Sequence, residues 1–365
     1  MEIEVFEQIA GAYAFQASEY TVEKYGSGLI HFTCFLKHKT DPGKNYILQQ
    51  LNTQVFNQPE IIAGNYSIAN AYLKKKHQAY NFLQFVNTYD RKNYYTDAKG
   101  RVWRLMNYIN NSFSYDTVHE AVVAHSAAQE FAQLTYLLSG SAIHQYQSPI
   151  VDFHNLSKRY TSFLKACSEA VSERKQQAQK LIDFAENNRA IVQHYKTISE
   201  NAGIPLRIIH ADTKVNNILF DKTTLQALCV VDLDTLMPGY FISDLGDMIR
   251  TMLCDCPEDE TDRQKINIRP DFFEAIVAGY IKGMNNSLTK EEKKNIFYAG
   301  QFMLYMQGLR FLTDYLQNDV YYPIKHKEHN LQRAQCQFWI LEGLMEREGE
   351  LQGIIDKQLV LLSQK

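Results

Sequence analysis

The apolar positions of the first hundred residues form short runs that alternate with turn-forming segments. The segment 41–45, with the sequence Asp-Pro-Gly-Lys-Asn, is rich in residues that favour turns. A helix is predicted from Glu60 to about Lys75, directly after Pro59. The extended runs that this pattern predicts cover residues 21–24, 30–37, 46–48 and 101–108. We therefore expect this part of the chain to fold as a small sheet with one helix.

Farther along the chain, apolar residues recur at a spacing of three and four, which predicts helices. This spacing covers residues 118–138 and 160–195, and it returns from Phe272 to the end of the sequence. Short β-rich runs with polar insertions interrupt it between residues 208 and 234. The order predicts a bilobal α+β fold, with a β-rich N-lobe over residues 1–105 and a mostly helical C-lobe over residues 106–365. No flexible linker separates the lobes, so we expect them to pack around a cleft.

Two polar stretches within the β-rich interruption carry candidate chemistry. The first has the order His-x-Asp-x-Lys-x-x-Asn at positions 210–217. The second is an apolar strand that ends in Asp232 and Asp234. Because alternate residues of a strand point to the same face, we expect these two carboxylates to lie on one side. A turn between the stretches predicts a hairpin that would bring Asn217 close to Asp232.

Phosphoryl transfer needs this set of groups. A carboxylate must orient the attacking hydroxyl group and accept its proton, and Asp212 suits that role. Oxygen ligands must hold a magnesium ion against the phosphates, which Asn217 and Asp232 could provide, with Asp234 as a possible further ligand. Lys214 could neutralise charge on the transferred group.

A structural reading competes with this interpretation. Taken alone, Asp212 and Asn217 could be a capping carboxylate and a hydrogen-bonded amide in a buried polar loop. Their joint spacing, followed by a strand that ends in an aspartate, favours catalysis instead. His210 is expected to brace the loop through hydrogen bonds and not to act as a base.

The order of these residues resembles the catalytic loop and metal-binding aspartate of protein kinases. The interval from Asp212 to Asn217 is also that of aminoglycoside phosphotransferases and choline kinases. The resemblance implies a protein-kinase-like fold and a dependence on ATP and Mg²⁺.

A longer set of blocks is similar to N-acetylhexosamine 1-kinases of the aminoglycoside phosphotransferase family. These blocks lie in the family's order along nearly the whole chain, at residues 46–49, 52, 55–56, 232–239, 243–250 and 309–316. The resemblance implies transfer of the ATP γ-phosphate to the anomeric hydroxyl group of N-acetylglucosamine or N-acetylgalactosamine.

The resemblance also implies roles for further residues. Asp244 and Asp247 would support the catalytic loop together with His210, although helix-capping carboxylates would have the same pattern. The sugar would contact Asp212, Asp234, Arg310 and Tyr321, while the structural alternatives are an arginine lying along its helix and a packed tyrosine. The expected nucleotide-binding residues are Gly26, Ser27, Gly28, Gln49, Met106 and Tyr108.

The chain departs from the pattern at two of the expected nucleotide-side positions. Kinases of this fold carry a cation on the third strand, whereas the aligned position here is Gln49 or Gln50, and a glutamine can donate a hydrogen bond but brings no charge. The family usually has an asparagine where this chain has His31. A glycine pair such as Gly26 and Gly28 is also found in ordinary strand turns.

Composition excludes some classes of partner. The formal net charge of −3 leaves no basic excess for a nucleic acid. No apolar run is long enough for a bilayer, and the N-terminus lacks the pattern of a signal peptide. The six scattered cysteines are expected to be reduced thiols of a cytoplasmic protein. The expected partners are ATP and a small sugar, and protein partners stay open.

Two other hypotheses remain. The segment 255–262 carries five acidic residues, which are typical of a solvated loop but could attract a cationic acceptor such as an aminoglycoside or choline. The other is a catalytically inactive scaffold that binds nucleotide, and Gln49 is its support.

Overall fold

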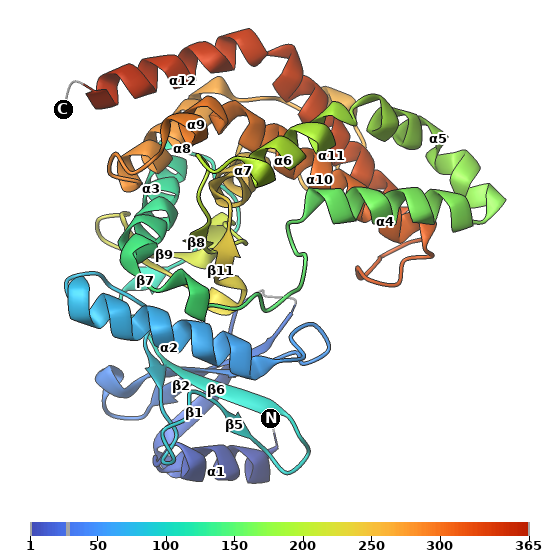
Figure 1. Cartoon of the computed structure of the whole chain (residues 1–365). Coiled ribbons are helices and arrows are strands. Elements are labelled where there is room, and N and C mark those ends of the chain that lie inside the picture. The colour runs from blue at the N-terminus through green and yellow to red at the C-terminus, as the bar shows by residue number, and fades with distance from the viewer. Residues whose placement is uncertain (1, 27–29, 364–365) are drawn as a thin grey trace. The chain divides into compact units, whose positions relative to one another are not determined.

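The computed structural model describes residues 2–26 and 30–363, which fall into two compact units (Figure 1). The sheet unit comprises residues 1–113, 140–151 and 219–237, and the helical unit comprises residues 114–139, 152–218 and 238–365. Both units are therefore discontinuous along the chain. The division into functional lobes after residue 105 stays a prediction.

The sheet unit is built on an antiparallel sheet with the strand order β1-β2-β3-β6-β4, and β5 also pairs with β6. The extended runs predicted over residues 21–24, 30–37 and 46–48 match the pairing of β1 with β2 and of β2 with β3. The strand bounds are Tyr20–Lys24 for β1, Phe32–His38 for β2, Tyr46–Gln50 for β3, Phe85–Val86 for β4, Tyr95–Thr96 for β5 and Val102–Asn107 for β6.

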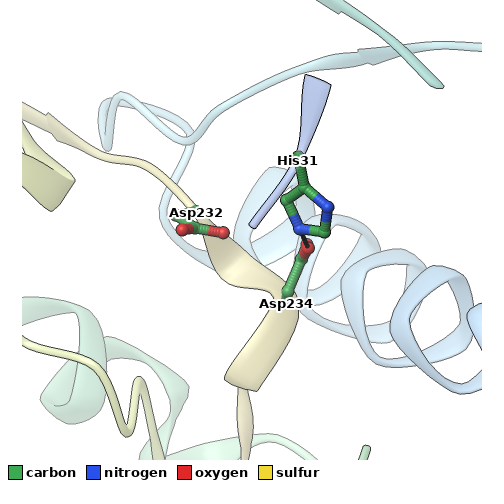
Figure 2. Close-up of side chains that lie close together, drawn as sticks. All are labelled: His31, Asp232 and Asp234. Carbon is green, nitrogen blue, oxygen red and sulfur yellow. Dashed lines mark hydrogen bonds and ion pairs between the residues drawn. The ribbon is translucent and has the colours of Figure 1, made fainter. Parts of the chain in front are cut away.

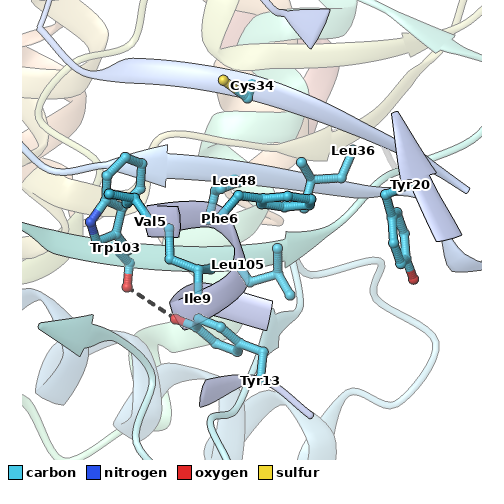
Figure 3. Packing of buried hydrophobic residues seen from close by; sticks show 10 residues of the cluster. All are labelled: Val5, Phe6, Ile9, Tyr13, Tyr20, Cys34, Leu36, Leu48, Trp103 and Leu105. Atoms are coloured by element: carbon cyan, nitrogen blue, oxygen red, sulfur yellow. Dashed lines mark hydrogen bonds between the residues drawn. The ribbon is translucent and has the colours of Figure 1, made fainter. Parts of the chain in front are cut away.

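One face of this sheet is covered by helix α1 (Ile3–Ala12), as Figure 3 shows. Leu36, Leu48 and Leu105 lie on three neighbouring strands, and their side chains are buried on the same face of the sheet. Alternate residues of a strand point to one face, which explains this arrangement. The Tyr13 hydroxyl group donates to the carbonyl oxygen of Trp103 at 3.0 Å. The buried residues of this core are Val5, Phe6, Ile9, Tyr13, Tyr20, Cys34, Leu36, Leu48, Trp103 and Leu105.

Helix α2 (Pro59–Lys76) joins distant segments to the sheet unit. Its buried Asn65 donates to the carbonyl oxygens of Gln147 and Leu236 at 2.7 and 2.8 Å, and it accepts the Gln147 amide at 3.0 Å. The Tyr66 ring stacks on Phe85 with centroids 3.8 Å apart. These bonds explain why residues 140–151 and 219–237 belong to this unit.

The predicted hairpin exists, but its second strand is shorter than expected. Strand β9 (Ile218–Asp221) lies between β7 (Ser112–Phe113) and β10 (Ala227–Val230). The prediction that Asp232 and Asp234 alternate along a strand is wrong because β10 ends at Val230. Asp232 has a left-handed φ of 58°, and a 3₁₀ turn, η6 (Leu233–Thr235), follows it.

The helical unit packs around α10 (Ile296–Leu316), which is buried along most of its length. The helical spacing predicted over residues 160–195 corresponds to three helices, α4, α5 and α6, and the extended backbone of Ala170 and Val171 separates the first two. The helix bounds are Ala121–Leu137 for α3, Leu156–Glu169 for α4, Ser172–Asn187 for α5, Ala190–Glu200 for α6, Phe241–Met252 for α7, Pro270–Gly283 for α8, Lys290–Lys294 for α9, His329–Glu346 for α11 and Glu348–Ser363 for α12. A small two-stranded sheet pairs β8 (Arg207–Ile209) with β11 (Met237–Gly239).

All six cysteines are free thiols. Within residues 2–26 and 30–363, no helix combines the length and the hydropathy that a membrane crossing requires.

Candidate active site

The predicted catalytic loop follows β8 in the helical unit, and α7 holds its backbone. Asp244 accepts the backbone amides of His210 and Ala211 at 2.9 and 2.7 Å. Asp247 accepts the amide of Thr213 at 2.8 Å. The two carboxylates lie three positions apart, which places them on the same face of α7. This geometry fits the supporting role predicted for them.

The supporting carboxylates are themselves buried. Burial raises the pKa of Asp244 to about 6, although the His210 ring and the two bound amides act in the opposite direction. Asp247 accepts a second bond from Arg250 Nε at 2.8 Å, and Arg250 Nη1 reaches Glu258 at 2.9 Å. Arg250 therefore connects the loop after α7 to the support of the catalytic loop.

Replacing Asp244 by Ala is expected to destabilise the protein by at least about 2 kcal/mol, since two buried amides lose their acceptor at about 1–3 kcal/mol each. Denaturant unfolding would measure this loss, with exposed Asp271→Ala as the control. Equal stability of the two variants would contradict the structural role.

The predicted catalytic residues meet within this loop. Lys214 Nζ lies 3.0 Å from Asp212 Oδ1, and this carboxylate raises the pKa of Lys214. Asn217 Nδ2 donates to the Asp212 carbonyl oxygen at 2.9 Å and to Asp212 Oδ2 at 3.2 Å. These bonds use the amide nitrogen of Asn217, and the metal-binding role of its Oδ1 stays a prediction. Ala211 has a left-handed φ of 64°, a strained conformation that the Asp244 bond stabilises.

Asp232 and Asp234 lie in the sheet unit, next to His31, which directly precedes β2 (Figure 2). One ligand atom from each of the three residues falls within 4.8 Å of the others. His31 Nδ1 accepts the Asn52 amide at 3.0 Å, so its proton is on Nε2, which donates to Asp234 Oδ2 at 2.7 Å. Because both ring nitrogens are used in this way, His31 is a support for Asp234 and not a cation ligand.

Asp234 is also paired with Arg104, a residue that the sequence analysis missed. Arg104 Nη1 bonds to Asp234 Oδ1, while Arg104 Nε and Nη2 both donate to Gln49 Oε1, at 2.9 and 2.7 Å. Burial alone would raise the pKa of Asp234, but Arg104 and His31 hold it well below its usual value. Both oxygens of Asp234 are thus engaged by side chains, and its predicted roles as a metal ligand and a sugar contact stay predictions, as does the metal role of Asp232.

The signal that could have revealed Arg104 is its place in an apolar run. A charged residue in a strand that is otherwise buried on both faces requires a partner. Gln49 stands directly opposite Arg104 in the sheet register, so the uncharged residue on β3 has a cation beside it on β6.

The predicted nucleotide-binding residues are described only in part. Gly26 has a φ of 76°, which side-chain-bearing residues rarely adopt, whereas Ser27 and Gly28 lie outside the described residues. Met106 is buried within β6. The Tyr108 ring lies 4.6 Å from the ring of Phe35, measured between centroids. The nucleotide role of all these residues stays a prediction.

The predicted sugar residue Arg310 lies on α10 among aromatic rings. Its guanidinium group is 5.1 Å from the Phe153 ring and 5.5 Å from the Tyr322 ring, and Nη1 donates to Gln307 at 2.9 Å. Tyr321 is 58% exposed, and Asp314 accepts its backbone amide at 2.8 Å. The sugar-binding roles of Arg310 and Tyr321 remain predictions.

His154 is a second residue that sequence reasoning missed. Burial, assisted by the charge of Arg310, lowers the pKa of His154 to about 3, while Asp212 acts in the opposite direction. The ring is therefore neutral, and its buried Nδ1 has no hydrogen-bond partner among the described residues. Arg310 and Asp212 thus act on a common group in the helical unit.

The acidic segment 255–262 is largely occupied by internal ion pairs. Glu258 pairs with Arg250, and Asp259 lies 3.0 Å from His329 and 3.4 Å from Lys325. Glu260 accepts two amides of its own loop. Most of this negative charge therefore stabilises the loop and is not directed at a ligand.

Comparison with known proteins gives one family match and a shared fold. A family model described as "Phosphotransferase enzyme family" matches residues 40–280. A choline kinase from Cryptosporidium parvum Iowa II is 11% identical, with a TM-score of 0.59 and coverage of 97% of this chain and 98% of that chain. A microcompartment-associated aminopropanol kinase is 13% identical, with a TM-score of 0.63 and coverage of 96% and 98%.

An amicoumacin kinase, solved with AMP-PNP, Ca²⁺ and its ligand, is 12% identical, with a TM-score of 0.61 and coverage of 94% of this chain and 93% of that chain. At these identities the similarity concerns the fold. The predicted α+β, protein-kinase-like architecture is confirmed.

Proposed function

Because this chain belongs to the phosphotransferase enzyme family, we propose that it transfers the γ-phosphate of ATP to the anomeric hydroxyl group of an N-acetylhexosamine. The product would be the sugar 1-phosphate. The observation that carries the phosphoryl-transfer part is the catalytic loop, in which Asp212 is held by Lys214 and Asn217 on a backbone fixed by α7.

Each proposed role follows from these contacts. Asp212 would orient the sugar hydroxyl group and accept its proton, and the anomeric hydroxyl group is the most acidic one on the ring. Lys214 would stabilise charge on the transferred group. Asn217 and Asp232 are the residues expected to hold Mg²⁺, because their side chains carry the oxygen donors that this ion prefers. Bound Mg²⁺ would neutralise the phosphates.

ATP as the donor is supported by the fold and by the amicoumacin kinase, whose structure contains an ATP analogue and a divalent cation. Gly26 stands at the predicted phosphate loop with the backbone conformation that a glycine allows. The reading as an inactive scaffold is disfavoured because Asp212, Asn217 and Asp232, the residues that phosphoryl transfer needs, are all present.

The proposal of a neutral acceptor rests on the charges of the helical unit. The Arg310 guanidinium group lies 5.1 Å from the Phe153 ring, and Arg159 donates to the Phe153 carbonyl oxygen at 3.1 Å, directly beside His154 in the chain. A cationic acceptor would meet repulsion from these guanidinium groups, whereas a sugar can accept hydrogen bonds from them. The unpartnered Nδ1 of neutral His154 suits a hydroxyl or amide group.

An amine-bearing acceptor is the second candidate. The choline, aminopropanol and amicoumacin kinases share the fold of this chain, and choline carries a permanent positive charge. The acidic segment that would have attracted such a compound is occupied by Arg250, Lys325 and His329. This occupation favours the sugar.

The decisive experiment offers ATP and Mg²⁺ with N-acetylglucosamine, N-acetylgalactosamine, glucose, galactose, choline and kanamycin. Phosphorus NMR of each product would locate the phosphate group. We expect a 1-phosphate of an N-acetylhexosamine, with weaker turnover of glucose and galactose. A 6-phosphate, or turnover of the two cationic compounds alone, would refute the proposal.

Replacing Arg310 by Ala is expected to raise the KM for the sugar by about 10- to 100-fold, because a charged hydrogen bond contributes about 1.5–3 kcal/mol. The KM for ATP should change little. Steady-state kinetics with each substrate varied in turn would measure both. Arg333→Ala is the matched control, since Arg333 also lies over an aromatic ring, Phe311, at 5.4 Å. Equal effects of the two substitutions would contradict a sugar contact.

A further inference from the structure

A row of polar side chains crosses the sheet on the face opposite α1. Thr33, Gln49 and Arg104 stand on neighbouring strands, with Thr33 opposite Gln49 and Gln49 opposite Arg104. Gln49 Nε2 donates to Thr33 Oγ1 at 3.0 Å, and Gln49 Oε1 accepts two bonds from Arg104. The row continues from Arg104 to Asp234.

Arg104 is fixed on every side by these partners. Its side chain is 2% exposed, and all three of its nitrogens donate, two to Gln49 and one to Asp234. The guanidinium group lies 5.3 Å from the Phe85 ring. The planar guanidinium group of arginine can donate to Gln49 and Asp234 at the same time, whereas the ammonium group of a lysine would reach only one of them.

The partner of Arg104 belongs to the turn that presents Asp232. Asp234 lies within η6, two positions beyond Asp232, whose left-handed backbone begins this turn. His31 holds the other oxygen of Asp234. Movement of Asp234 would therefore move the Asp232 carboxylate as well.

We propose that Arg104 is a positioning residue, which through Asp234 fixes the turn that orients Asp232 toward the divalent cation. This inference rests on the proposed phosphotransferase function for the identity of the cation. Kinases of this fold carry a cationic residue on the third strand. In this chain Arg104 supplies the positive charge from β6, and it pairs with Asp234 beside the proposed metal ligand. Gln49 aligns the guanidinium group.

Direct contact of Arg104 with phosphate is the competing interpretation. It would require the guanidinium group to leave Gln49 and Asp234, and so to leave a carboxylate with 1% exposure without its cation. Leaving one partner of a buried ion pair unpaired is strongly destabilising. The structure favours the positioning role for this reason.

The test is a double-mutant cycle of Arg104→Met and Asp234→Asn, read by binding and not by turnover. Electron paramagnetic resonance would titrate Mn²⁺ into the full chain with saturating AMP-PNP and no acceptor. We expect each single substitution to weaken Mn²⁺ binding about 10- to 100-fold, which is the usual effect of removing a support of a metal ligand. The double variant should lose much less than the product of the two losses.

Arg101→Met is the matched control, because Arg101 pairs with buried Asp97 at 2.7 Å and does not contact Asp234 in the described structure. It should lower the melting temperature and leave Mn²⁺ binding unchanged. Where Arg104→Met fails to fold, Arg104→Lys is measured instead and should weaken Mn²⁺ binding in the same direction.

Two results would overturn the proposal. Additive losses, with weaker AMP-PNP binding of Arg104→Met in EDTA, would assign Arg104 to the phosphates. If Arg104→Met binds Mn²⁺ as tightly as Arg101→Met does, Arg104 contributes only to the stability of the fold. Neither result depends on the acceptor, so a failure of the sugar assignment would leave this test valid.

Discussion

The Asp212→Asn variant is expected to fold normally and to lose about 10²- to 10⁴-fold in kcat, the usual contribution of a general base. The amide has the shape of the carboxylate, but it cannot accept the proton of the acceptor hydroxyl group. The loop backbone should not move, because Asp244 and Asp247 hold its amides independently of Asp212. Turnover and the melting temperature would be measured on the same preparation.

The control for Asp212→Asn is Asp183→Asn on the surface of α5, where the exposed carboxylate accepts a bond from Gln179 at 2.7 Å. Normal turnover is expected for it. A kcat of Asp212→Asn within about threefold of the wild type would remove Asp212 from the role of base, given the size of that contribution.

The Asp232→Ala variant should lose more than about 100-fold in activity, since removing a direct metal ligand costs at least as much as removing its support. Asn217→Ala should raise the Mg²⁺ requirement and recover at high Mg²⁺, because the amide brings no charge to the ion. Asp232→Ala should recover little. Activity measured over a Mg²⁺ series would compare the two variants, and full activity of Asp232→Ala at ordinary Mg²⁺ would show that another residue is the ligand.

Local sequence patterns predicted the hairpins and α2 well. Turn formers at 41–45 and alternating apolar residues define β2 and β3, and the helix expected from Glu60 begins at Pro59. The same patterns did not place the break at Val171 or the end of β10 at Val230, because both depend on backbone conformations that neighbouring segments select.

The candidate catalytic residues could be recognised in the sequence because they lie within one loop and in the turn after the next hairpin. Their supports could not. Arg104 and Asp234 are separated by 130 positions, and His31 and Asp234 by 203. Such pairs leave no periodic signal, so only the three-dimensional fold identifies them. His31 drew notice in the sequence as a departure, and its hydrogen bond to Asp234 explains it.

The bond between Gln49 and Arg104 has a consequence for how such sheets can diverge. A lysine at position 49 would stand opposite Arg104 and place two cations next to a single carboxylate, Asp234. Loss of Arg104 alone would leave that carboxylate buried without a cation. The cation can stand at position 104, as here, or at position 49. A substitution at only one of these positions leaves unbalanced charge in a buried site, which is unfavourable. We therefore expect related proteins to change positions 49 and 104 together, so that only one of the two strands β3 and β6 carries the cation.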